Sequence, residues 1–113
     1  MKNTLSKWTL ALAAVGIIAT ATAVRAADGA SVYTDNCAKC HGMEGKGDTK
    51  MGTKLGCKDL SSAAVQAALT DAAATKAIKE GVKEDDKTKM KAFEDLSDAD
   101  VSAVVAYVRT LKK

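Results

Sequence analysis

The sequence predicts a single all-α domain, and three features of residues 27–113 support this fold class. Apolar residues near the C-terminus recur at steps of three and four, which places them on one face of a helix: Val101, Val104, Val105, Val108 and Leu111. Residues typical of helix ends, such as Thr70, Gly81 and Ser97, border other helix-compatible segments. No segment alternates convincingly between apolar and polar residues, so we expect about four helices and no sheet.

The first predicted helix covers residues 29–40, with Asp28 as its N-cap, and leads into the stretch NCAKCHG at residues 36–42. A loop follows, with five glycines between Gly42 and Gly56. Glycines at this density disfavour both helix and strand interiors. We therefore predict an irregular segment after the cysteine motif.

Three further helices complete the predicted domain. A short alanine-rich helix begins at Ser61 or Ser62 and ends near Leu69, and another covers residues 71–80 up to Gly81. A polar loop, VKEDDKTKMKAFEDL, separates these from the last helix. That helix starts after Ser97, and the acids that follow this residue suit the positive end of a helix dipole.

The first 26 residues have the features of a secretory signal peptide. Lys2 and Lys7 precede an apolar run that extends from about Leu10 to Ala23, and small residues lead to Ala26. The run is shorter than the ~20 residues that a membrane span needs, which disfavours an uncleaved anchor. We expect cleavage near Ala26 and a mature chain, residues 27–113, that is periplasmic or otherwise exported and has no stable membrane span.

Loss of this segment changes the charge of the protein. The precursor has 17 basic and 14 acidic residues, and removing Lys2, Lys7 and Arg25 leaves fourteen of each sign. Neutrality removes the main support for nucleic-acid binding. The mature chain also retains few aromatic residues, which are Tyr33, Phe93 and Tyr107. A core with so little bulk is marginal at this chain length, so a bound group would help to fill it.

The motif CAKCH, with Cys37, Cys40 and His41, is compatible with three chemistries. A redox dithiol requires a βαβ setting that is not predicted here. A Cys3His zinc site could include Cys57, but Cys40 and His41 are adjacent, whereas zinc ligands are usually separated. Covalent haem attachment accounts for all three residues, because the two thiols reach the two vinyl groups and the next imidazole reaches the iron. We therefore predict haem c.

A second axial ligand would have to come from a methionine, because His41 is the only histidine. Met43 is too close to His41 to reach the opposite face of a haem, and Met51 lies in the loop that follows His41. Met90 lies in the polar loop between two predicted helices, where the chain would return over the far face. The spacing favours Met90.

The whole mature chain resembles the bacterial class I c-type cytochromes. The segment GASVYTDNCAKCHGMEGKGDTKMG resembles their first helix and haem-binding loop, KMKAF their methionine loop, and LSDADVSAVVAYVRTL their last helix. The resemblance implies one haem, bound covalently by Cys37 and Cys40, with His41 and Met90 as axial ligands. It also implies that Gly29, Tyr33 and Tyr107 lie where the first and last helices meet. Family members often have proline after the axial methionine, whereas this chain has no proline and has Lys91 there.

An iron with six ligands has no open position for a substrate, so we expect an electron carrier and not an enzyme. We also expect the protein to be a monomer. The alternatives are a five-coordinate haem for gas binding or peroxidase-like activity, a zinc module, and a subunit docked in a larger complex. Cys57 has no assigned role and is expected to be buried. Lys87, Lys89 and Lys91 around the methionine loop suggest a redox partner with an acidic surface.

Overall fold

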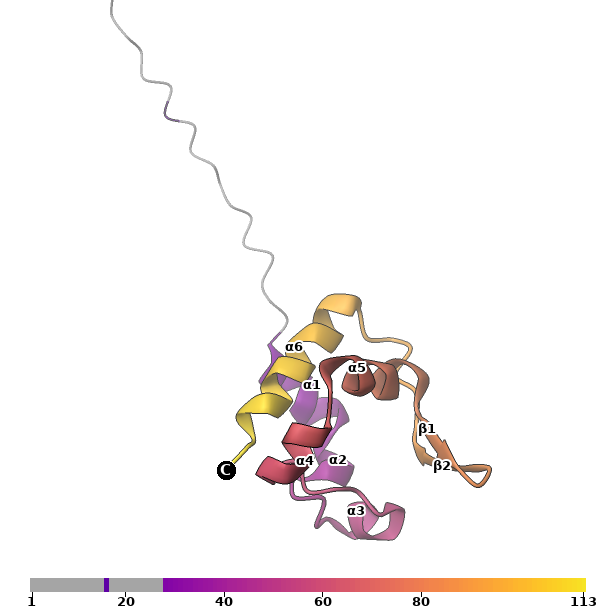
Figure 1. Ribbon diagram of the computed structural model, residues 1–113. Helices are drawn as coiled ribbons and strands as arrows, with labels where there is room; N and C mark the ends of the chain where they lie inside the picture. Colours follow the sequence, from indigo (N-terminus) through magenta and orange to yellow (C-terminus); the bar gives the residue numbers. More distant parts are fainter. Residues whose placement is uncertain (1–15, 17–27) are drawn as a thin grey trace, which may run out of the picture.

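The structure is a computed structural model that describes Gly16 and residues 28–113. Over residues 28–113, six helices and one two-stranded hairpin follow each other in the chain (Figure 1). They are α1 (Gly29–Asn36), α2 (Ala38–His41), α3 (Lys50–Leu55), α4 (Ala63–Ala68), α5 (Asp71–Glu80), β1 (Val82–Glu84), β2 (Lys87–Met90) and α6 (Asp98–Thr110). The predicted helical fold is confirmed. The predicted signal segment, apart from Gly16, and its cleavage near Ala26 lie outside the described residues.

Most predicted helix starts are confirmed, and a side chain caps each of these helices. Asp28, Ser62, Thr70 and Ser97 each accept a hydrogen bond from a backbone N–H in the first turn of α1, α4, α5 and α6. At α6 the cap is reciprocal, since Asp100 also accepts from the Ser97 N–H. Such caps satisfy backbone donors that a helix leaves without internal partners.

Three predictions about local structure were wrong. The glycine-containing loop includes the helix α3, which starts at the N-cap Thr49 and ends at Gly56 in the left-handed conformation. The polar loop after Gly81 contains the antiparallel hairpin of β1 and β2, which accounts for the only strands in residues 28–113. The first predicted helix is also interrupted at Cys37, which ends α1 and precedes α2.

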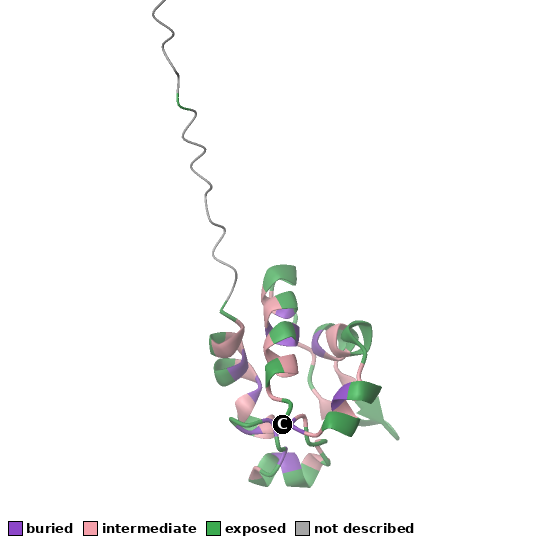
Figure 2. Cartoon of the chain, turned by 60° about the vertical axis from the view of Figure 1, so that its left-hand side comes forward, coloured by how far each residue is buried: buried purple, intermediate pink, exposed green. Residues whose placement is uncertain are grey.

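The core lies where α1 crosses α6, and it requires a close backbone approach. A Cβ atom on Gly29 would stand 2.3 Å from the carbonyl oxygen of Ala103, so only glycine allows this contact. Tyr33 is fully buried there, and its ring centroid lies 5.2 Å from that of Tyr107. Val101 and Val104 on α6 are likewise buried. Figure 2 shows buried positions, in purple, on several helices. The resemblance therefore assigned Gly29, Tyr33 and Tyr107 to the correct interface.

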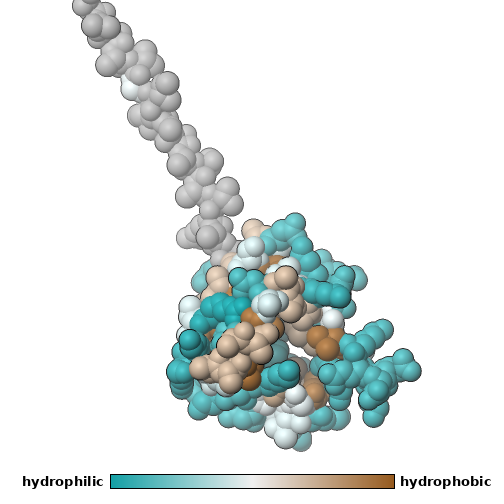
Figure 3. Space-filling model, in the orientation of Figure 1, coloured by the Kyte–Doolittle hydropathy of each residue, from teal (hydrophilic) through white to brown (hydrophobic). Residues whose placement is uncertain are grey.

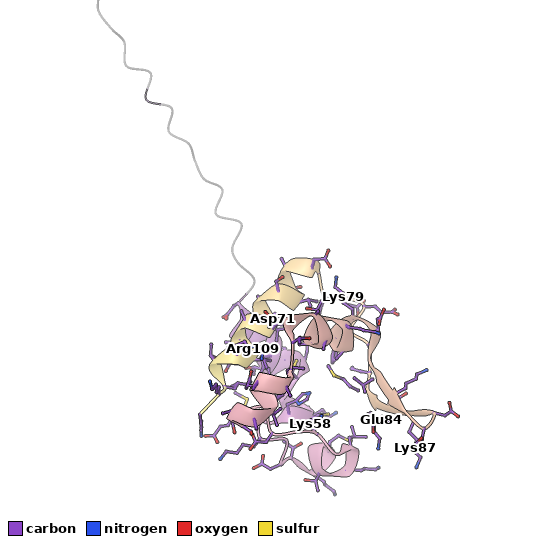
Figure 4. The ribbon with its side chains drawn as sticks, viewed as in Figure 1. Lys58, Asp71, Lys79, Glu84, Lys87 and Arg109 are labelled. Carbon is purple, nitrogen blue, oxygen red and sulfur yellow. The ribbon has the colours of Figure 1, made fainter. Side chains whose placement is uncertain are left out.

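Arg109 ties the corner between α4 and α5 to α6. Its guanidinium donates to Asp71 Oδ1, at 2.8 Å from Nη2, and to the carbonyls of Gln66 and Leu69 (Figure 4). The buried Gln66 side chain donates in turn to the carbonyls of Leu60 and Val108, at 2.6 and 2.9 Å. These bonds satisfy carbonyls at the end of a short helix and hold α4 beside α6. Along residues 28–113, no helix is both long and apolar enough to cross a membrane.

Candidate functional site

Two adjoining cavities form a cleft beside the α1–α6 core. The inner cavity has a volume of about 130 Å³ and an almost wholly apolar lining, which includes Tyr33, Leu60, Ile78 and Val104. The outer cavity has a volume of about 410 Å³ and is lined by residues of α2, α3 and β2. Its volume alone is within the range of small-molecule and cofactor sites. In Figure 3, hydrophobic residues lie at the surface directly beside the hydrophilic hairpin.

The cysteine motif forms one wall of this cleft. The N–H groups of Cys40 and His41 both donate to the carbonyl of Cys37, at 3.2 and 2.9 Å. Residues three and four positions apart in such a turn share one face, so the local backbone gathers these three side chains. Cys37 and His41 line both cavities, and Cys40 lines the outer one. The structure therefore brings together the three motif residues that the sequence indicated.

The turn is fixed from outside by hydrogen bonds and by close packing. Thr49 Oγ1 donates to the carbonyl of Cys40 at 2.7 Å, and the N–H of Gly47 donates to the carbonyl of His41 at 2.7 Å. A Cβ on Gly52 would lie 2.2 Å from the Cys40 carbonyl oxygen, which shows how closely α3 approaches α2. Sequence reasoning missed Thr49 and α3, although threonine is a common N-cap residue.

The His41 imidazole is mostly inside the protein, and one of its nitrogens lacks a hydrogen-bond partner among the described residues. This nitrogen, Nδ1, is buried. Desolvation by burial lowers the pKa of His41, which favours the neutral ring, in which one nitrogen keeps its lone pair. In α3, the carbonyls of Gly52 and Thr53 accept bonds from the N–H groups of Cys57 and Gly56, respectively.

Met90 lies on the wall of the cleft formed by the hairpin. It is the last residue of β2, is half-buried, and lines both cavities together with His41. Met51 lines only the outer cavity and is 39% exposed, and Met43 is 60% exposed and lines neither. Of the three methionines considered, Met90 reaches deepest into the cleft.

Phe93 extends the same wall and was not singled out from the sequence. Its N–H donates to the carbonyl of Ile78 at 2.8 Å, and the Nζ of Lys91 lies 5.1 Å from the centre of its ring. Phe93 lines the outer cavity close to Met90. Its signal in the sequence was weak, because a single aromatic residue in a polar loop is compatible with many roles.

Cys57 is half-buried rather than buried as expected, and it also lines the outer cavity. Burial, and secondarily the neighbouring Cys40, raises the pKa of its thiol. Burial, with Cys40 second, also raises the pKa of the Cys37 thiol to about 11. In the part of the chain that the structure describes, no three His, Cys, Asp or Glu side chains are placed to hold a metal ion. The geometry thus gives no support to the zinc alternative.

The residues present fit a covalently attached, largely apolar group that brings its own metal. Two thiols and one neutral imidazole come from a single helical turn, a thioether faces the same space, and most of the inner lining is apolar. The buried Nδ1 without a partner is costly unless the ring has a function that compensates for it. This donor set suits a soft or borderline iron in a macrocycle better than a bare hard cation.

The comparisons with known proteins agree with this donor set. The family model for cytochrome c matches residues 26–112. A solved structure titled KustC0563 c-type cytochrome has a TM-score of 0.67 and 33% sequence identity, covering 76% of this chain and 99% of its own. A mutant of Kustc0563 has a TM-score of 0.64 and 31% identity, with 75% and 99% covered. None of the curated proteins matches the chain.

Proposed function

The chain belongs to the cytochrome c family, and we propose that it is an exported one-electron carrier with its haem c bound by Cys37, Cys40, His41 and Met90. Membership of this family indicates a covalently bound haem c, and its members are typically electron carriers. The observation that carries the proposal is the shared cleft, in which Cys37, His41 and Met90 line both cavities.

Cys37 and Cys40 are the residues we assign to the thioether bonds. The helical turn places their side chains on one face, and Cys37 is only 8% exposed, so attachment would occur at the floor of the cleft. Two bonds to neighbouring positions of one turn restrict both the tilt and the depth of the group. They also consume both thiols, which leaves Cys57 as the free cysteine in our assignment.

His41 and Met90 are the residues that would bind the iron of a haem in this cleft. Burial lowers the pKa of His41 and so favours the neutral ring, which is the state that binds a metal. A thioether is a soft ligand that favours the reduced iron. When bound, a haem with these two ligands supplies reversible one-electron chemistry, with a potential set by the ligands, burial and nearby charge.

The remaining lining residues of the inner cavity are mostly apolar. They are valine, leucine, isoleucine and alanine side chains together with Tyr33, whose hydroxyl donates a hydrogen bond to the Gly42 carbonyl. Apart from the residues already assigned and Cys57, the titratable groups around the outer cavity are Asp35, Lys39, Lys89 and Lys91. Lys39 and Lys91 are exposed, and no second histidine exists in the chain. We therefore favour electron transfer over peroxidase-like catalysis.

The mouth of the cleft is where we expect a redox partner to dock. Lys39, Lys89 and Lys91 line the outer cavity, as does the exposed side chain of Met51. Lys87 lies further out on the hairpin (Figure 4). A partner with an acidic rim would be steered to this mouth, in a short-lived complex that weakens with salt. We propose Lys39 in place of Lys87 as the third lysine of this rim.

The ligand assignment is tested by comparing Met90→Ala with the matched variant Met51→Ala in the purified haem protein. We expect the oxidised wild type and Met51→Ala to show the weak far-red charge-transfer band of thioether-bound ferric haem, and Met90→Ala to lack it. The reduced Met90→Ala protein should bind carbon monoxide, whereas the other two should not.

Two results would contradict this assignment. Loss of the band in Met51→Ala but not in Met90→Ala would make Met51 the ligand. Rapid carbon monoxide binding by the wild type would favour the five-coordinate alternative. Export is tested separately, by N-terminal sequencing of protein from the periplasmic fraction, for which we expect a start near Ala27.

A further inference from the structure

Met90 belongs to a paired strand and not to an irregular loop. Its Cα partner across the hairpin is Val82, which follows Gly81 at the end of α5. Asp85 and Asp86 form the tip with positive φ angles of 50° and 63°. Two successive residues with positive φ are typical of the tight turn that matches the twist of a hairpin. The chain has no proline that could stiffen this segment, so the hairpin is the element that orders it.

The pairing contains one irregularity, and it lies directly beside Met90. Lys83 pairs with Thr88 and Glu84 with Lys87, but the register shifts between Lys83 and Val82, so Lys89 is an additional residue in β2. Because side chains alternate along a strand, one additional residue reverses the direction of those that follow. Thr88, Lys89, Met90 and Lys91 all line the outer cavity, and of these four Met90 alone also lines the inner one.

Gly81, at the end of α5, lies in close contact with the backbone of residues 90–92. Its φ is 77° and its ψ −179°, a conformation that is essentially restricted to glycine. A Cβ atom here would stand 2.6 Å from the Met90 carbonyl oxygen and 2.9 Å from the Ala92 nitrogen. The hydrogen bond from the Phe93 N–H to the Ile78 carbonyl, at 2.8 Å, fixes the chain three residues later.

We propose that Gly81 and the bulge at Lys89 are positioning elements that hold the Met90 thioether in the cleft. This inference rests on the proposed function, because it assumes that Met90 is an iron ligand. Gly81 permits the close approach of the two backbone segments, and the bulge selects the face of the hairpin from which Met90 extends. Neither residue touches the iron in this account, so both act through Met90.

The first test compares Gly81→Ala with Gly56→Ala in the ferric haem protein. Gly56 also has a positive φ, 71°, but an added Cβ would meet nothing within 4 Å, which makes it a control for a positive-φ glycine that no neighbouring atom crowds. The measurements are the far-red band and the affinity for imidazole, which competes with a methionine ligand. We expect Gly81→Ala to weaken the band and to bind imidazole at least about tenfold more tightly, while Gly56→Ala resembles the wild type.

The second test addresses the bulge and does not depend on the folding of Gly81→Ala. Deletion of Lys89 should restore regular pairing and turn Met90 away from the cleft, so that the band is lost. The substitution Lys89→Ala keeps the chain length and should retain the band. If the deletion retains the band and the wild-type imidazole affinity, the bulge does not position Met90 and the proposal is overturned.

The outcomes also separate this inference from the proposed function. If Met90→Ala abolishes the band but Gly81→Ala and Gly56→Ala bind imidazole equally, Met90 is a ligand and Gly81 is not a positioning residue. If Met90→Ala retains the band, the ligand assignment and this inference both fail.

Discussion

The side of the molecule built from α1, α5 and α6 differs from the side built from α3 and the hairpin in what stabilises it. The buried apolar residues of the described chain, apart from Cys37, are Tyr33, Ile78, Val101, Val104 and Val105, and all lie on α1, α5 and α6. In α3 the buried residue is Gly52, and no residue of the hairpin is buried. Figure 2 shows the same contrast between purple helix positions and the mostly green hairpin.

The difference indicates that the two sides obtain their apolar contacts from different sources. On the first side, the helices pack against each other, and the Tyr33 hydroxyl donates to the Gly42 carbonyl at 2.6 Å. On the second side, Met51, Leu55, Met90 and Phe93 line the outer cavity, and of these only Met90 and Phe93 also pack against the core. A haem in that cleft would therefore supply the packing that the second side lacks.

The largest expected effect is that of removing the haem. We expect the double variant Cys37→Ala/Cys40→Ala, purified without haem, to lose most of its helical circular dichroism, because a cleft of this size would be left unfilled in a small domain. Amides of α3 and the hairpin should exchange fastest. A haem-free variant with full helicity and unchanged exchange would show that the two sides do not differ in this way.

A smaller effect is expected from overpacking the helix crossing. Gly29→Ala would place a methyl group 2.3 Å from the Ala103 carbonyl oxygen, and we expect a loss of about 2 kcal/mol in the free energy of unfolding. Ser102→Ala on the exposed face of α6 should change it by less than about 0.5 kcal/mol. Denaturant titration of the haem protein measures both. Equal stability of the two variants would mean that α1 can move away from α6 at little cost.

The smallest effect on the fold should come from replacing the lysines around the outer cavity, because these residues act on association with a partner and not on folding. Replacing Lys39, Lys89 and Lys91 with glutamine should slow electron exchange with an acidic partner several-fold at low salt and flatten its dependence on ionic strength. The visible spectrum and the thermal midpoint should stay unchanged. The matched control replaces Lys54, Lys58 and Lys76, which do not line the outer cavity. An equal effect of both sets would indicate a non-specific charge effect.

The contrast between the two sides also explains how far the sequence could be interpreted. Helix α6 and the starts of α4 and α5 were predictable because period and capping are local properties of Val101, Ser62 and Thr70. The hairpin was not predictable, since VKEDDKTKM has no clear alternation, and its turn depends on two aspartates with positive φ. The helix α3 was missed because Gly52, which argues locally against a helix, is needed there for close packing on Cys40.

At the site, the sequence indicated Cys37, Cys40 and His41 because all three lie within one turn. It also favoured Met90, by its position in the chain and by the resemblance of KMKAF to a methionine loop, but could not indicate that Met90 lies in a paired strand beside a bulge. The approach of Cys57 and Phe93 to the cleft was equally unforeseen, since both depend on tertiary packing. Contacts between residues far apart in the chain were therefore the main limit of the sequence.

The most direct test of the account is to map the haem on the denatured protein by mass spectrometry. The account predicts one haem per chain that is retained after denaturation and is found, after proteolysis, on the peptide that contains Cys37 and Cys40, with Cys57 unmodified. Haem that dissociates on denaturation, or that is attached through Cys57, would contradict the assignment of the cleft.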